Sequence, residues 1–180
     1  MKVVKDNKET AKKAAEVTKG LQSGDKKLAL KAVKKARKDG TAEHISMMIE
    51  LMVNNNDDEL NGEIIKLLND LKMQEAAEPI IEALKEEANK DVHIFLWQAL
   101  WQSRLDASPY LSDLVNLALK SDYLILLECL TIIENLQNAP EDEVVVQLNT
   151  TLKDAVLENH EHRELILSMI EVLNDLMLDK

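Results

Sequence analysis

Several residue types that usually shape a globular fold are scarce in this 180-residue chain. It has one cysteine, three prolines and four glycines, and aromatic residues make up only 3% of it. A single cysteine excludes an intrachain disulfide. Few prolines and glycines favour helices with short joints over sheets with many turns. Hydrophobic residues still make up 46% of the chain, so Leu, Ile, Val, Ala and Met must fill the core.

Long apolar segments are also missing. No uninterrupted apolar run approaches the ~18 residues of a transmembrane helix, so we expect no membrane span. The first residues, MKVVKDNK, lack the apolar centre of a secretory signal peptide. The lone Cys129 lies within an apolar helical run, which predicts a buried small hydrophobe. Together these absences predict a cytoplasmic protein.

Charge is unevenly divided along the chain. The formal net charge is −11, but residues 1–38 carry 13 Lys/Arg and 4 Asp/Glu, giving +9. Residues 39–180 carry 9 Lys/Arg and 29 Asp/Glu, giving −20. A split of this size concerns association and partners rather than the fold. We expect the basic end to dock on the acidic remainder of the same molecule, and we expect a monomer.

A repeat organises the middle of the sequence. In Gln74–Asn138, an amphipathic helical pattern, a break near an Asp and a more apolar helical pattern occur twice, 30 residues apart. A fixed period of this length with two helices per unit is typical of α-solenoids. The anchors Ala36, Leu68, Leu100 and Leu130 extend the period towards the N-terminus with spacings of 32, 32 and 30.

Five helix pairs follow from the apolar periodicity and the turn residues. We expect a single domain over residues 1–180, with a basic N-terminal capping pair in residues 1–40 and acidic repeats in 41–180. The predicted helices are Thr10–Leu21 with Asp25–Lys38, Thr41–Val53 with Asp57–Leu71, Glu75–Ala88 with Asp91–Arg104, Pro109–Lys120 with Asp122–Gln137, and Glu141–Leu157 with Glu161–Leu178.

Some residues predict local detail. Asp25 and Ser108 each precede a helical pattern and are expected to cap it. Pro79 leaves only a loose first turn for the residues before it. Gly62 lies inside a helix, where it marks a close contact between helices. The second predicted helix has an apolar face, which comprises Leu28, Leu30, Ala32, Val33 and Ala36.

The unit around Ala77–Gln102 has a distinctive set of residues in its two helices and at the joint between them. They are Pro79, Ile80, Leu84, Asp91, Val92, Ala99 and Leu100. With these residues the unit resembles a HEAT repeat, a family that has a Pro near the start of its first helix, an Asp at the joint and an Ala/Leu-rich second helix. His93 replaces the Arg that the family favours. The resemblance implies an all-α, right-handed α-solenoid of about five HEAT-like helix pairs, whose second helices line a concave protein-binding face.

A second apolar arc suggests where a partner binds. Ile94, Trp97 and Trp101 share a side of their helix that differs from the side of Leu96 and Leu100, and Leu124 and Leu127 repeat the pattern. Trp is common among interface hot spots, so these five residues form the candidate partner-binding site. The alternative is a central helix that is apolar nearly all round because it packs on several neighbours.

No residue set specifies a reaction, and we expect no catalytic residue, no cofactor and no metal. His160, His162 and Glu164 resemble a metal cluster, but positions two apart diverge on a helix, so exposed loop residues are expected. His44 and His93 are interpreted as ordinary polar positions. No phosphate-binding loop and no His-Glu-x-x-His motif occurs.

The predicted function is a noncatalytic scaffold that binds protein or peptide. One alternative is an accessory or lyase-type HEAT module that chaperones a small ligand. Another is nucleic-acid binding through the Lys-rich N-terminal helices. DNA-alkylation-repair glycosylases also use HEAT-like repeats with Trp and Asp, which Trp97, Trp101 and Asp106 superficially match. The −20 charge of residues 39–180 argues against a DNA-binding groove in this part of the chain, because a surface of that charge would repel DNA.

Overall fold

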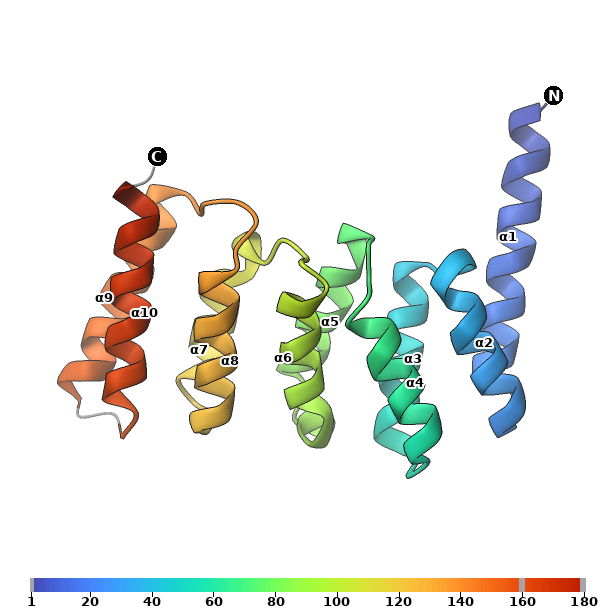
Figure 1. The fold of residues 1–180 in the computed structure, drawn as a ribbon, viewed down its shortest axis with the longest axis horizontal. Coiled ribbons are helices and arrows are strands. Elements are labelled where there is room, and N and C mark those ends of the chain that lie inside the picture. Colours follow the sequence, from blue (N-terminus) through green and yellow to red (C-terminus); the bar gives the residue numbers. More distant parts are fainter. Residues whose placement is uncertain (1, 159–160, 179–180) are drawn as a thin grey trace. The chain divides into compact units, whose positions relative to one another are not determined.

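The computed structural model describes residues 2–158 and 161–178, with side chains from Glu9 onward. Within these residues the chain forms ten α-helices and three 3₁₀ turns and no β-strand, so the predicted all-α class is confirmed (Figure 1). The chain divides into two compact units, Met1–Ala99 and Leu100–Lys180, and the division falls inside helix α6.

The first unit arranges its helices in two layers. Helix α3 packs on α1 and on α5 in one layer, while α2 packs on α4 in the other. Helices α1 and α2 pair across the layers, as do α3 and α4. The elements are α1 (Lys2–Leu21), α2 (Lys26–Asp39), α3 (Ala42–Asn54), α4 (Asp58–Leu68), η1 (Gln74–Ala76), α5 (Ala77–Lys85), η2 (Glu87–Val92) and the first part of α6 (His93–Gln102).

Several helices begin next to the capping and turn residues that the sequence contains. The side chain of Asp25 accepts a hydrogen bond from the Leu28 N–H, which confirms its predicted capping role, and Asp57 caps α4 in the same way. The turn before Pro79 is 3₁₀ rather than α, as expected for a loose first turn. A second 3₁₀ segment, η2, precedes α6, where the sequence predicted a break and then α-helix from Asp91.

The core of the α1–α2 pair is thin and made mostly of small residues. Gly20 allows close approach, since a Cβ added there would lie 2.6 Å from the Cβ of Ala32. Leu28 is 50% exposed, so its predicted place on the apolar face is wrong, and Ala29 is buried instead. The buried residues of the pair are Val17, Leu21, Ala29, Ala32, Val33 and Ala36.

His44 joins α3 to α1, and its interpretation as an ordinary polar position is wrong. It is buried, and its Nδ1 accepts a hydrogen bond from the Thr41 N–H at 2.9 Å. Because Nδ1 is an acceptor, Nε2 carries the proton and faces the Ala14 carbonyl oxygen at 3.1 Å and the Thr18 hydroxyl at 3.0 Å. The imidazole thus caps α3 and holds α1 against it.

Ion pairs connect the basic first pair to the next one. Lys26 contacts Asp57 and Glu59, each at 2.8 Å, and Arg37 contacts Asp70 at 3.1 Å. The hydrogen bonds that the Lys26 ammonium donates to the Asp57 and Glu59 carboxylates raise the pKa of Lys26, and the bond to Asp57 lowers the pKa of that carboxyl group. These contacts support the intramolecular docking predicted from the charge split, although each pair is largely exposed to solvent.

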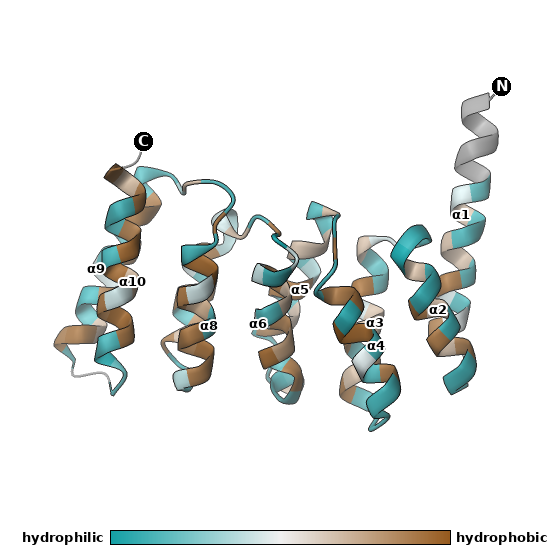
Figure 2. Ribbon diagram, in the orientation of Figure 1, coloured by the Kyte–Doolittle hydropathy of each residue, from teal (hydrophilic) through white to brown (hydrophobic). Residues whose placement is uncertain are grey.

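The second unit contains two further helix pairs. Helix α7 packs on α8 and α9, and α10 packs on α8 and α9, so α7 with α9 and α8 with α10 form two layers. Hydrophobic residues dominate α8, whereas polar residues alternate along α2 (Figure 2). The elements are the end of α6, η3 (Ser108–Tyr110), α7 (Leu111–Ala118), α8 (Tyr123–Glu134), α9 (Asp142–Leu157) and α10 (Arg163–Leu178).

Large aliphatic side chains fill the core of the second unit. Cys129 is fully buried among them, as predicted, and burial raises the pKa of its thiol to about 12. The thiol is therefore protonated and unreactive in the folded state. The buried residues of α7 and α8 are Leu111, Leu114, Val115, Ala118, Ile125, Leu126, Cys129, Leu130, Ile132 and Ile133.

Asp106 ties two connections of the second unit together. Its Oδ1 accepts hydrogen bonds from the backbone N–H and hydroxyl of Ser108, and its Oδ2 accepts one from the Asn138 amide at 2.6 Å. Burial alone would raise the pKa of Asp106, but these bonds outweigh it and lower the pKa. The predicted cap at Ser108 is wrong, because Ser108 donates its hydroxyl hydrogen bond to Asp106 instead.

Candidate functional site

The start of α8 exposes large apolar side chains. Tyr123, Leu124 and Leu127 are 50%, 57% and 38% exposed. They are three and four positions apart, so they share one side of the helix, opposite the buried side chains of Ile125, Cys129 and Ile132. We call this surface the outer face of α8. Its exposure agrees with the prediction that Leu124 and Leu127 lie outside the core stripe.

Helix α10 extends this surface. Its buried residues Ile166, Met169 and Leu173 match Leu126, Cys129 and Ile133 of α8 at a constant offset of 40 residues. The same offset relates the exposed Leu127 to Leu167, which is 39% exposed.

The two helices also start side by side. The Tyr123 ring meets the His162 ring edge-on, with centroids 5.6 Å apart, just before α10 begins. Because α8 and α10 pack together and both begin at this ring contact, the common offset puts Leu127 and Leu167 at corresponding positions of the two helices.

Trp101 lies beside the outer face of α8. Its indole Nε1 donates a hydrogen bond of 2.7 Å to the Glu128 carboxylate, and the ring is partly exposed. Glu128 follows Leu124 by one helical turn, so the indole reaches the same side of α8 as the exposed leucines. Three of the five predicted residues, Trp101, Leu124 and Leu127, therefore gather in the second unit.

The other two predicted residues belong to the first unit. Trp97 is only 1% exposed, so its indole is part of the core and the expectation that it forms a binding platform is wrong for this side chain. Ile94 is half-buried. The spacing of Ile94, Trp97 and Trp101 predicted a shared side of α6 but could not distinguish a buried indole from an exposed one.

The second unit is strongly acidic around its apolar surface. Residues 100–180 carry 5 Lys/Arg and 15 Asp/Glu, a formal net charge of −10. Glu164 and Glu171 lie on α10 at the positions that Leu124 and Thr131 occupy on α8, and both are exposed. The outer face thus combines exposed leucines with carboxylates, which suits a partner that is both apolar and basic.

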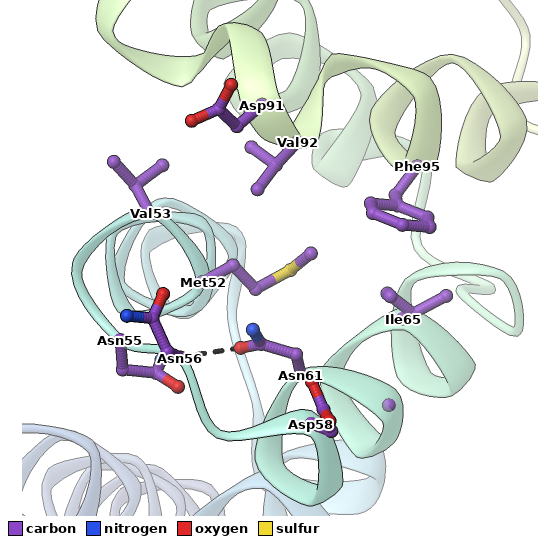
Figure 3. A pocket seen from close by; sticks show the side chains of 11 residues that line it. Met52, Val53, Asn55, Asn56, Asp58, Asn61, Ile65, Asp91, Val92 and Phe95 are labelled. Atoms are coloured by element: carbon purple, nitrogen blue, oxygen red, sulfur yellow. Dashed lines mark hydrogen bonds between the residues drawn. The ribbon is translucent and has the colours of Figure 1, made fainter.

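A cavity of about 370 Å³ lies in the first unit. The end of α3, the turn before α4, one side of α4 as far as Ile65 and the junction of η2 with α6 surround it (Figure 3). No residue in it was predicted as a site from the sequence. Its lining consists of Met52, Val53, Asn55, Asn56, Asp58, Asn61, Gly62, Ile65, Asp91, Val92 and Phe95.

Gly62 has no side chain and therefore leaves space in this cavity. A Cβ added to Gly62 would meet no atom within 4 Å, so its interpretation as a close helix contact is wrong. The close contact is at Gly20 instead, the other glycine inside a helix. The sequence alone does not distinguish Gly20 from Gly62. Whether an added side chain would contact another residue depends on segments that are distant along the chain.

The histidines do not form a reactive cluster. His93 faces the backbone oxygen of Glu86 at 3.3 Å, and His162 contacts Tyr123 and Glu161, with a side chain only 20% exposed rather than fully in solvent. His160 lies outside the described residues. Among the side chains that the structure describes, no three His, Cys, Asp or Glu residues are grouped as metal ligands. Nor is any described helix both long and apolar enough to cross a membrane.

The residues of the glycosylase-like set are each engaged in local contacts or buried. Asp106 uses both carboxylate oxygens to hold Ser108 and Asn138, Trp97 is buried, and the Trp101 N–H is bonded to Glu128. Comparison with family models, curated proteins and solved structures found no match for this chain. The outer face of α8 and the cavity beside Gly62 are therefore judged on their own geometry.

Proposed function

We propose that the protein is a noncatalytic binding module that holds a basic amphipathic segment of a partner protein on the outer face of α8. The observation that carries the proposal is the exposure of Tyr123, Leu124 and Leu127 beside the Trp101–Glu128 hydrogen bond. Isolated exposed leucines are common on protein surfaces, but here three apolar side chains are adjacent and Leu167 extends them onto α10.

The carboxylates around the outer face of α8 favour a partner with basic side chains. An apolar segment alone would offer no cation to the exposed carboxylates of Glu164 and Glu171, whereas Lys or Arg at the rim of the partner can bind them. An amphipathic helix offers both, with apolar side chains three and four residues apart and basic side chains between them. Because the rim pairs are exposed, they contribute mainly to association rate and specificity, and the leucines contribute most of the affinity.

The finer architecture belongs to the same proposal. We infer a right-handed α-solenoid of about five HEAT-like helix pairs, with second helices on the partner-binding side, in a cytoplasmic monomer. Two-layer packing within each unit and the 40-residue match between the burial patterns of α8 and α10 support this inference. A crystal structure with the second helices on opposite sides of the molecule would contradict it.

The binding test uses a 14-residue helical peptide with Leu at positions that face one side and Lys elsewhere. Trp101 fluorescence should change on titration at about 0.15 M salt, where exposed charge pairs are partly screened. Leu124→Ser combined with Leu127→Ser should weaken binding at least tenfold, or about 1.4 kcal/mol, with little loss of stability, because both side chains are exposed.

Leu157→Ser is the matched control, since Leu157 is 77% exposed on α9 and outside the outer face of α8. It should leave peptide binding unchanged. A second peptide with Glu in place of Lys should bind far more weakly. Equal binding of both peptides, or equal loss in the Leu157→Ser control, would overturn the proposal.

A further inference from the structure

The cavity of the first unit contains two carboxylates that no cation of the described chain neutralises. Asp57 and Glu59 lie on either side of Asp58 and both pair with Lys26, whereas Asp58 makes no ion pair among the described residues. Asp91, from the other side of the cavity, makes none there either (Figure 3). We propose that this cavity binds an alkylammonium or alkylguanidinium group.

The polar part of the cavity suits such a cation. Asn61 presents its amide oxygen, which already accepts a hydrogen bond from the Asn55 amide at 3.3 Å. The Asn56 side chain also lines the cavity and is exposed. A guanidinium or ammonium group has only donors, so carboxylates and amide oxygens can satisfy it.

The apolar part suits an alkyl stem. Met52 and Val92 are buried, and Ile65 and Phe95 are half-buried at the same cavity. A short alkyl chain can cover these side chains while its charged end stays near Asp58 or Asp91. The Phe95 ring adds an attractive surface for a cation within about 6 Å of its centre.

The helix ends leave the cavity negative overall. The C-terminal end of α3 has a partial negative charge that favours a cation, although the side-chain amides of Asn54 and Asn55 already donate hydrogen bonds to the Glu50 and Leu51 carbonyl groups. The N-terminal end of α4 has the opposite charge, but Asp57 caps it and Asp58 lies in its first turn. The only charged residues that line the cavity are the two aspartates, so a neutral or anionic ligand would leave both unpaired.

Gly62 supplies the room for this ligand. A side chain at Gly62 would begin in open space at the cavity wall and extend into it. Gly62→Leu should therefore occupy the cavity while α4 remains intact, since leucine is a better helix former than glycine. This variant blocks the site without touching either carboxylate.

The test is a titration of the full chain with butylguanidinium, followed by NMR at about 0.15 M salt. Saturable shifts should appear at the Met52 methyl group and at the Asn61 amide. Butylurea has nearly the same shape without the charge, and it should shift them at least tenfold less at equal concentration. Asp58→Asn with Asp91→Asn, and separately Gly62→Leu, should each weaken binding at least tenfold.

A second titration distinguishes the source of the cation. A capped Ala-Arg-Ala tripeptide should bind if a partner's side chain is the ligand, and its citrulline counterpart is the neutral control. Binding of either guanidinium probe supports the proposal, and the better probe identifies a free small molecule or a peptide as the source. No saturable shift with either probe, shifts that persist in Gly62→Leu, or equal shifts with the urea would overturn it.

Discussion

The pairs α1–α2 and α7–α8 share an arrangement but are held together by different interactions. In α7–α8 the buried side chains are mostly Leu and Ile. In α1–α2 the buried side chains are mostly Ala and Val, and polar contacts through His44, Lys26 and Arg37 hold the pair to its neighbours. A helix pair can thus be attached to its unit by apolar area or by a few directed polar contacts.

The largest expected effect is in the aliphatic core of the second unit. Leu126→Ala should lower the free energy of unfolding by about 2–5 kcal/mol, because Leu126 is fully buried and truncation leaves a cavity. Val33→Ala in α2 removes fewer atoms and should cost less. Urea denaturation followed by circular dichroism gives both values. The neighbouring Leu127→Ala is the control and should change stability by less than about 0.5 kcal/mol. Equal losses at Leu126 and Leu127 would mean that the assigned faces of α8 are wrong.

Removing the imidazole of His44 should have the next largest effect, of about 1–3 kcal/mol. His44→Ala removes the acceptor of the Thr41 N–H and the contacts of the ring with Ala14 and Thr18 of α1, and it leaves a cavity where the buried imidazole lay. Hydrogen exchange should show faster opening of α1 and α2 and little change in α7–α10. Ser46→Ala, exposed on the same helix, is the control. Uniform destabilisation of both units would argue against a local role for His44.

Two glycine substitutions should change the stability of the protein in opposite directions. Gly20→Ala should destabilise the protein by about 1 kcal/mol or more, because the new methyl group overlaps Ala32 and the helices must separate. Gly62→Ala should stabilise it by about 0.5–1 kcal/mol, because alanine favours the helix and meets no neighbour. Thermal unfolding of the two variants compares them directly. Adding Ala32→Gly to Gly20→Ala should restore part of the loss if crowding is the cause.

The smallest effect should come from the exposed ion pairs of α2. Lys26→Gln should reduce stability at about 0.01 M salt, and the difference from the unmodified protein should shrink as salt approaches 1 M. Lys27→Gln is the matched control, since Lys27 is exposed and makes no ion pair among the described residues. The two variants should differ at low salt and converge at high salt. A salt-independent difference would assign the role of Lys26 to packing rather than charge.

The sequence predicted the helices well because it contains their local causes. Apolar spacing and a capping residue such as Asp25 act within one or two turns, and the Asp25 carboxylate accepts the expected backbone hydrogen bond. The exposure of Leu124 and Leu127 also followed from spacing, since they fall outside the stripe of Leu126 and Leu130.

Features that depend on distant neighbours were not predictable in the same way. His44 looks like any polar residue until α1 supplies Ala14 and Thr18 as partners 30 and 26 positions away. The cavity beside Gly62 joins α3 and α4 to Asp91 and Phe95, and no local pattern connects these segments. Burial of Trp97 likewise depends on the packing around α6, whereas its position on the helix depends only on spacing.

The fluorescence of the two tryptophans of α6 can report on the two units separately. The buried Trp97 is in the first unit and should emit at shorter wavelength than the partly exposed Trp101, whose N–H is bonded to the Glu128 carboxylate in the second unit. Replacing either indole by Phe leaves a single emitter, so unfolding of each unit can be followed without a dye. A ligand that reaches the outer face of α8 should quench or shift the Trp101 emission and leave that of Trp97 constant.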